Sequence, residues 1–226
     1  MIKLVNISKS YNMNKSNEAR VLQSVSLTVE QGDMVGIIGP SGVGKSTLLH
    51  ILACIDTSDT GEYWLFDKLI TGLNNTEYSK IRNTQIGIVL QEFALVEEIT
   101  VMQNVIIPMI FGKRIGKKAM RQKAESVLDK VGILELKNQP VWSLSGGQKQ
   151  RTAIARAIIN EPKLILADEP TGALDEKTTH DIVQLFARLN TMGQTIIIIT
   201  HDPIVAKACR RTISMSRGAL NEIDII

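Results

Sequence analysis

The sequence has few of the features that mark secreted or membrane-embedded proteins. It contains two cysteines, Cys54 and Cys209, in apolar surroundings and without metal-ligand spacing, so we expect small core residues in a reducing compartment. The N-terminus lacks a basic region followed by a long apolar core, which argues against a secretory signal. The longest apolar run, Val105 to Phe111, is interrupted by Pro108 and is far shorter than the roughly 20 residues of a membrane span. We therefore expect a cytoplasmic protein that contacts a membrane only through a partner.

Strong charge is also lacking. The net charge of +3 is too small to indicate nucleic-acid binding by itself. Hydrophobic residues make up 44% and charged residues 22% of the chain, which is ordinary for a globular protein. A length of 226 residues predicts one domain, or a domain with a subdomain, with enough core to need no disulfides.

A glycine-rich loop is the most informative stretch that is present. An apolar strand pattern over residues 34–38 precedes it and a helical pattern over 48–53 follows it, as a phosphate-binding loop requires. The glycines let backbone N–H groups turn inward, the lysine supplies charge for the β- and γ-phosphates, and Ser46 is placed to bind Mg²⁺. An ordinary glycine turn with a capping serine would not need both flanks. The predicted nucleoside triphosphate loop is Gly39, Pro40, Ser41, Gly42, Val43, Gly44, Lys45, Ser46 and Thr47.

A second anion-binding helix start is predicted at Ser145, Gly146, Gly147 and Gln148. Ser145 is in the capping position of a helix that continues to Ile159. Free N–H groups and the helix dipole favour a phosphate at such a position. Alone, this pattern also fits a simple helix cap.

Two strand ends carry the remaining candidates for chemistry. The apolar run 163–167 ends at Asp168 and Glu169, and the run 194–200 ends at His201. Ligands of parallel sheets bind at the carboxyl ends of strands. Asp168 therefore fits an Mg²⁺ partner, Glu169 an orienter or general base for the attacking water, and His201 a contact to the γ-phosphate or that water. The alternative for the two acids is a solvated strand end.

The rest of the chain divides into a part with strand patterns and a part with helical patterns. Residues 2–8, 21–30, 62–66 and 86–90 predict strands, whereas residues 92–160 predict mostly helix, including Val101 to Ile110 and Ala119 to Val131. A polar loop, 12–17, and a turn, 56–61, punctuate the first part, and a helix is expected from about Glu176 to Asn190. Tyr11, at the start of the loop, is either a core residue or a platform for a purine ring. The basic run from Lys113 to Lys123 is either a solvated helix face or a contact with an acidic partner or anionic lipid.

Taken together, these residues resemble the ATP-binding subunits of ABC transporters over essentially the whole chain. The Walker A loop is 39–47, the Q-loop glutamine is Gln91, and the signature is 144–148. Walker B is 164–168 followed by Glu169, the D-loop is 173–175, and the switch histidine is His201. The resemblance favours purine stacking for Tyr11.

Within that family, the segment 167–175 and the segment 150–157 resemble the subgroup that serves lipoprotein release, macrolide export and antimicrobial-peptide transport. The chain departs from the subgroup pattern at Cys54, Lys149 and Ala173, and none of these departures removes a catalytic group.

The resemblance implies an α/β fold, with a P-loop NTPase (RecA-like) core around a mainly parallel sheet. It also implies an N-terminal antiparallel β subdomain and an inserted helical subdomain. Residues 1–226 would form one ABC ATPase domain, with 1–90 and 161–226 as core and β subdomain and 91–160 as the helical subdomain carrying the signature.

The resemblance also implies a head-to-tail dimer around two ATP molecules. In one protomer Tyr11 and residues 39–47 would bind the nucleotide, and Ser46, Gln91 and Asp168 would hold Mg²⁺. Ser145, Gly146, Gly147 and Gln148 of the other protomer would complete the site. Lys45, Gln91, Glu169 and His201 would be catalytic, and closure would drive an integral membrane permease at the inner face of the cell membrane.

Three functions share these motifs. A transport ATPase, exporting peptide, lipoprotein or drug-like substrates, is the favoured interpretation; a non-transporting regulator of a membrane partner is the alternative. A DNA-repair ATPase would need a long coiled coil or zinc insertion between the Walker motifs, and the chain has no room for one. We therefore expect no nucleic-acid partner.

Overall fold

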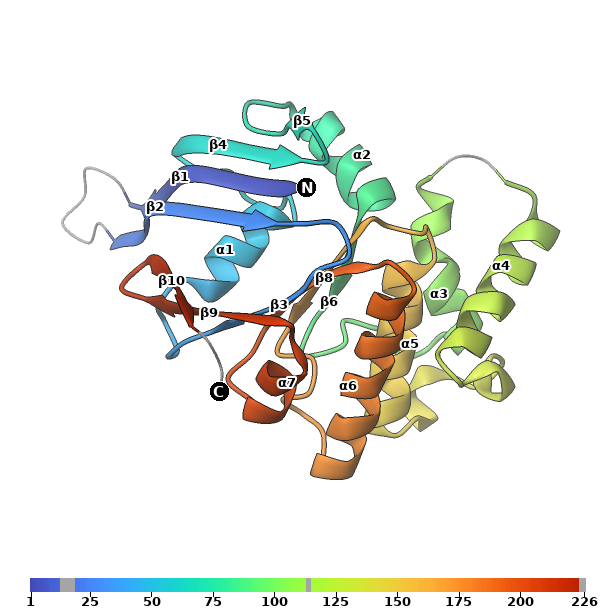
Figure 1. Ribbon diagram of the computed structural model, residues 1–226. Coiled ribbons are helices and arrows are strands. Elements are labelled where there is room, and N and C mark those ends of the chain that lie inside the picture. Colours follow the sequence, from blue (N-terminus) through green and yellow to red (C-terminus); the bar gives the residue numbers. More distant parts are fainter. Residues whose placement is uncertain (13–18, 113–114, 224–226) are drawn as a thin grey trace.

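The computed structural model describes residues 1–12, 19–112 and 115–223 and places two sheets around a shared core (Figure 1). The smaller sheet is antiparallel, in the order β2-β1-β4-β5. Its strands are β1 (Ile2–Tyr11), β2 (Ala19–Val29), β4 (Thr60–Leu65) and β5 (Lys68–Leu69). This is the expected N-terminal β unit, although β1 continues past residue 8 and takes in Tyr11.

The larger sheet has the order β10-β9-β3-β8-β7-β6. Its strands are β3 (Met34–Ile38), β6 (Ile86–Val89), β7 (Leu164–Asp168), β8 (Thr195–Ile199), β9 (Arg211–Ser216) and β10 (Ala219–Ile223). The five strands from β9 to β6 pair in parallel, and β10, at the edge, is the one antiparallel strand among those that the structure describes. The prediction of a mainly parallel central sheet in an α/β fold is confirmed. The strands β7 and β8 are apolar along most of their length because helices or the second sheet cover both faces.

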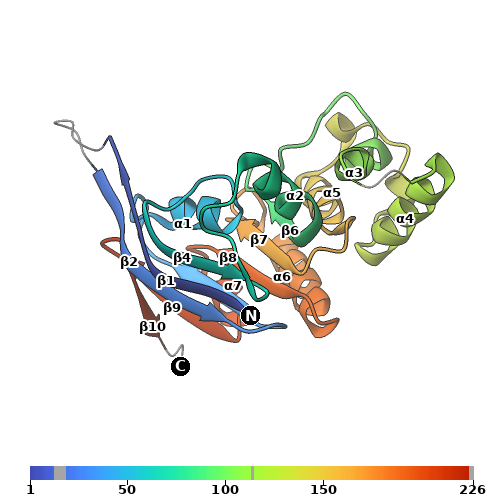
Figure 2. The same ribbon diagram turned by 90° about the horizontal axis from the view of Figure 1, so that it is seen from above.

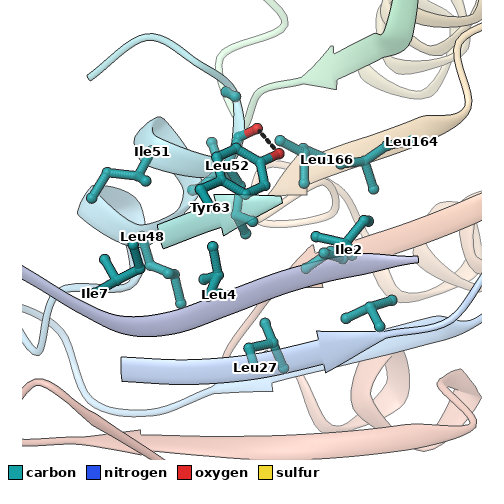
Figure 3. Close-up of a cluster of buried hydrophobic side chains, with 14 of the residues drawn as sticks. Ile2, Leu4, Ile7, Leu27, Leu48, Ile51, Leu52, Tyr63, Leu164 and Leu166 are labelled. Carbon is teal, nitrogen blue, oxygen red and sulfur yellow. Dashed lines mark hydrogen bonds between the residues drawn. The ribbon is translucent and has the colours of Figure 1, made fainter. Parts of the chain in front are cut away.

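The core between the two sheets is built around α1 (Lys45–Leu52). This helix contacts β2 on one side and β7 and β8 on the other. Figure 3 shows Leu48, Ile51 and Leu52 of α1 among Ile2, Leu4 and Leu27 from the antiparallel sheet and Leu164 and Leu166 from β7. Tyr63 is buried there and donates its hydroxyl to the carbonyl of Leu52 at 2.9 Å. The glycine loop that precedes α1 is thus anchored by a helix that packs between the two sheets.

Helices cover the other face of the parallel sheet and extend to one end of the molecule (Figure 2). They are α3 (Val101–Ile110), α4 (Lys117–Lys130), α5 (Gly146–Ile158) and α6 (Glu176–Thr191), with short 3₁₀ turns at Leu134–Leu136 and Val141–Ser143. The described part of residues 92–160 contains no strand, as the sequence predicts. Helix α4 begins and ends slightly before the predicted range 119–131.

Two helices of the structure were not predicted from the sequence. Helix α2 (Asn75–Gln85) buries only Tyr78 and Ile81, and the short α7 (Pro203–Ala208) precedes the β9–β10 hairpin.

Cys54 is buried as expected, but Cys209 is only partly covered. The strand expected over residues 62–66 lies at Thr60–Leu65, because Phe66 and Asp67 adopt positive φ in the turn to β5.

Candidate active site

The glycine loop follows β3 and ends at the first turn of α1. Gly44, at the N-cap of α1, has a φ of 106° and makes no side-chain cap hydrogen bond, so the first N–H groups of the helix are left for another acceptor. A Cβ at Gly44 would lie 2.8 Å from the Val21 carbonyl oxygen, and one at Gly39 would lie 2.3 Å from the Met215 carbonyl oxygen. Only glycine fits where the loop passes this close to β2 and β9.

Lys45 lies across the loop. Its Nζ donates to the carbonyls of Gly39 at 2.7 Å and Pro40 at 2.9 Å. The lysine charge is therefore held at the mouth of the concavity, with backbone N–H groups around it. This arrangement suits a polyanion whose oxygens would accept from both.

Asp168, at the end of β7, lies close to the start of α1. Burial raises the pKa of its carboxyl, as does the neighbouring Glu169, while Lys45 and a hydrogen bond with Ser46 oppose that shift. A hydroxyl and a carboxylate on adjacent strand and helix ends are hard oxygen donors of the kind that Mg²⁺ prefers. The two side chains therefore fit a magnesium ion, which would also satisfy the partly buried carboxylate.

Glu169 is held in an unusual backbone conformation beside His201. Its φ of 44° is in the left-handed region, which costs a non-glycine residue about 1–3 kcal/mol. The Glu169 N–H donates to the Ile199 carbonyl at 2.9 Å, which joins the ends of β7 and β8. Nδ1 of His201 lies 2.9 Å from Oε1 of Glu169, and the His201 N–H donates to Oε2 at 3.3 Å. His201 lies on the same rim as Glu169, as the sequence predicts, and the structure adds direct contacts between the two residues.

Gln91 approaches the same turn from β6. A Cβ at Gly172 would lie 2.8 Å from the Gln91 Nε2, so the absence of a side chain at Gly172 admits the glutamine amide. Thr171, in the same turn, donates to Asp202 at 3.4 Å. The structure thus gathers Lys45, Ser46, Gln91, Asp168, Glu169 and His201 at the carboxyl ends of β3, β6, β7 and β8.

The signature residues form a separate helix start. Ser145 caps α5 with a capping box: its N–H donates to Gln148 Oε1 at 2.9 Å and its Oγ accepts from the Gln148 N–H at 3.4 Å. A Cβ at Gly146 would lie 3.2 Å from Leu174 Cδ2, and one at Gly147 would lie 2.5 Å from Thr178 Cγ2. This end of α5 therefore packs against the start of α6.

Helix α5 also connects two segments that carry site residues, the turn after Glu169 and the segment after Gln91. Buried Gln150 donates through Nε2 to the Pro170 carbonyl at 2.6 Å, and its Oε1 has no hydrogen-bond partner among the described residues. Arg156 donates to the carbonyls of Phe93 and Ala94, which follow Gln91 in positive-φ conformations. Neither residue was predicted. Gln150 is on the buried side of an amphipathic helix, which was a signal that could have pointed to it, whereas Arg156 is only partly buried.

Tyr11 lies at the end of β1, where its hydroxyl donates to Asp56 Oδ2 at 2.8 Å. The side chain is 38% exposed, so the structure excludes a fully buried core role. The Thr47 side chain, at the end of the glycine loop, lies within hydrogen-bonding reach of the same hydroxyl.

Some sequence expectations fall outside this geometry. Lys113, Arg114 and residues 13–17 lie outside the described residues. The remaining basic run lies on or just before α4, where Arg121 pairs with Glu125 at 3.3 Å and Lys123 with Glu161 at 3.1 Å. Among the helices of the described segments, none is long and apolar enough to cross a membrane.

Comparison with known proteins shows to which family the chain belongs. The family described as ABC transporter matches residues 22–172. A Bacillus subtilis protein described as the uncharacterized ABC transporter ATP-binding protein YvrO is 48% identical over 97% of this chain and 95% of its own length. The macrolide export ATP-binding/permease protein MacB of Chlorobaculum tepidum is 41% identical over 97% of this chain, which spans 33% of that protein.

Solved structures of ABC transporter cassettes have the same fold as this chain. The dimeric structure of MJ0796, described as a bacterial ABC transporter cassette, is 39% identical, with a TM-score of 0.89 and 100% of both chains covered. A second structure of that cassette, described as a post-hydrolysis state bound to ADP and Pi, is 38% identical with the same TM-score and the same coverage. The chain belongs to the ABC transporter family and is one of its ATP-binding subunits.

Proposed function

We propose that two copies of this chain close head to tail around two ATP molecules and, by hydrolysing them, drive a separate membrane permease. The observation that carries this proposal is the division of the anion-binding groups into two separate helix starts. The start of α1 carries Lys45 and leaves its N–H groups uncapped, whereas the start of α5 is capped by Ser145 and has no acidic residue in its first turn. Neither start alone encloses a triphosphate, so each would need the other from a second copy.

The residues have distinct roles in this proposal. The N–H groups of residues 39–47 and Lys45 bind the phosphates, and Tyr11 stacks on adenine. Ser46, Gln91 and Asp168 would hold Mg²⁺, which supplies charge neutralisation when bound. Ser145, Gly146, Gly147 and Gln148 of the second copy would face the γ-phosphate and stabilise the charge that develops there.

Glu169 and His201 would handle the attacking water. Glu169 is positioned to accept a proton from water, because its carboxylate lies at the end of β7 and is held by two contacts from His201. The strained backbone keeps that carboxylate in place before nucleotide arrives. His201 is largely exposed and would keep the base oriented towards the γ-phosphate.

Glu169→Gln tests this assignment. The amide cannot act as a base, so we expect hydrolysis to fall by at least about 100-fold while ATP binding is kept and an ATP-bound dimer accumulates. Hydrolysis is measured as phosphate release, and dimerisation by light scattering with and without Mg-ATP. Glu161→Gln, at an exposed surface pair, is the control. Near-native turnover in the Glu169 variant would remove the proposed role.

A groove between α2, α3 and α5 is where we place the permease. It has a volume of about 770 Å³, and its walls include Arg82, Asn83, Pro108, Phe111, Arg156 and Asn160. Phe111 is 78% exposed, and the lining residues include Lys80 and two arginines but no acid. A cytoplasmic segment with an apolar side chain next to a carboxylate would complement this surface.

The groove is connected to the site by the contacts of α5. Arg156 lines the groove and also donates to the carbonyls that follow Gln91. A change at the nucleotide would therefore reach the permease through the 92–94 backbone and α5. The relative MacB, which is named as both ATP-binding protein and permease, supports a permease partner here. The transport role that we propose is export of peptide, lipoprotein or drug-like substrates from the inner face of the membrane, and the name of MacB supports the last of these.

Phe111→Ser tests the docking surface. The variant should lose co-purification with a permease after gentle detergent extraction, because the apolar anchor of the groove is removed. Its ATP hydrolysis as an isolated protein should stay within about twofold, since Phe111 touches no proposed nucleotide contact. Met192→Ser, at an equally exposed apolar position beyond α6, is the matched control. Unchanged recovery of the permease by Phe111→Ser would place docking elsewhere.

A further inference from the structure

A buried lysine lies behind the tyrosine that is proposed to hold adenine. Lys9 precedes Tyr11 on β1 and is only 8% exposed. Its Nζ donates to Asp56 Oδ1 at 2.9 Å and to the Thr57 carbonyl at 2.7 Å, and lies 3.7 Å from Asp59 Oδ1. Burying an ammonium group is costly unless it is paired and hydrogen-bonded, and here it is both.

The same carboxylate holds Lys9 and Tyr11. Asp56 accepts from Lys9 through Oδ1 and from the Tyr11 hydroxyl through Oδ2. Lys9 Nζ also lies 5.2 Å from the centroid of the Tyr11 ring, within the range of a cation–π contact. The ring is thus fixed at its edge by Asp56 and contacted on one face by Lys9, while 38% of the side chain stays exposed.

This cluster is joined to the glycine loop. Asp56 comes shortly after α1, and its N–H donates to the His50 carbonyl of that helix at 3.2 Å. Lys45, at the other end of the helix, lies across the glycine loop. The contacts that fix the ring and those that bind phosphate are therefore carried by one buried helix.

Lys9 is not needed merely to attach β1 to the turn at residues 56–59, because other hydrogen bonds do so. The Ser10 N–H donates to Asp59 Oδ2 at 2.6 Å, and the Asp59 N–H donates to the Ser8 carbonyl at 2.9 Å. These bonds hold β1 to the 56–59 turn without Lys9. Lys9 adds two further hydrogen bonds to this turn and the contact with the ring face.

We propose that Lys9, together with Asp56, is a positioning residue for the base of the nucleotide: it fixes Tyr11 as a platform for that base. The proposal rests on the adenine-stacking role assigned to Tyr11 above. Holding the ring before the ligand arrives removes part of the ordering cost of binding. The effect should be confined to ligands that carry a base.

The test compares ADP with pyrophosphate, both with Mg²⁺, by calorimetry on the wild type and on Lys9→Met. ADP affinity should fall about tenfold, within the range for loss of a stacked base. Pyrophosphate affinity should stay within about twofold. Lys9→Arg, which keeps the charge and its hydrogen bonds, should recover most of the ADP affinity. Lys3→Met, an exposed lysine on the same strand, should leave both affinities unchanged.

A double-variant cycle separates this proposal from the proposed function. If Lys9 acts through the ring, Lys9→Met should have no further effect on ADP affinity in a Tyr11→Ala background. An undiminished effect there, or equal loss of ADP and pyrophosphate, would overturn the proposal. If Tyr11→Ala itself keeps native ADP affinity, the stacking role fails first. Should Lys9→Met not fold, Tyr11→Phe removes the bond to Asp56 and should weaken ADP selectively; unchanged ADP affinity would then overturn the proposal.

Discussion

The two helix starts that carry the anion-binding groups are built in opposite ways. The start of α1 has a glycine N-cap with positive φ, no capping side chain and a lysine bound across the loop. The start of α5 has a serine N-cap in an extended conformation and a complete capping box. The first leaves its N–H groups to a ligand, whereas the capping box of the second occupies the N–H groups of Ser145 and Gln148. We therefore expect a phosphate to bind at α1 in a single chain, and α5 to contribute only when a second copy brings a nucleotide to it.

The glycines at the two starts also serve different purposes. Gly44 is required by its φ and by a backbone oxygen, so no change of a neighbouring side chain could accommodate a Cβ there. Gly147 has an ordinary backbone, and its obstacle is one methyl group of Thr178 on α6. Close packing against a neighbouring helix, rather than loop conformation, thus explains the glycine in the signature.

Gly147→Ala should have the largest effect among changes at α5. The new Cβ would overlap Thr178 Cγ2, and Thr178 cannot rotate freely because its Oγ1 donates to Asp175 at 2.7 Å. We expect a loss of about 1–3 kcal/mol in the free energy of unfolding, measured by denaturant titration. Adding Thr178→Ser removes that methyl and keeps the hydroxyl, so the double variant should recover most of the loss. No recovery would show that the α5–α6 contact does not explain the glycine.

Ser145→Ala should have a smaller effect on stability. Loss of the cap should cost about 1 kcal/mol. Hydrolysis should fall much further than monomer ATP affinity, because Ser145 would meet the nucleotide of the second copy only. Steady-state rates and equilibrium binding on the same preparation give this comparison, with Ser143→Ala, two residues earlier, as control. Equal loss of binding and hydrolysis would argue against a composite site.

The sequence predicted the parts of the fold that have strong patterns. The apolar strands 86–89, 164–168 and 195–199 are buried on both faces and were found within one or two residues. Helix α2 was missed because its sequence is mostly polar and only two side chains are buried. Its start could have been found from the capping box of Asn74 and Glu77.

The candidate site was predicted residue by residue, because its motifs lie at strand ends and helix starts. The connections between them were not. Lys9, Asp56, Gln150 and Arg156 act through contacts between segments that are 20 to 63 residues apart, and no local pattern encodes such contacts. The positive φ of Glu169 could not be predicted from the sequence either, since tertiary contacts impose it on a residue that does not favour it.

The most direct test of the composite site mixes two inactive chains. Lys45→Ala removes the phosphate charge at α1, and Ser145→Arg places a long side chain over the start of α5. A mixed dimer contains one site with neither change, so mixing the two proteins should restore hydrolysis well above the sum of the separate rates. A rate equal to that sum, in a mixture shown by light scattering to form dimers, would contradict a site shared between two chains.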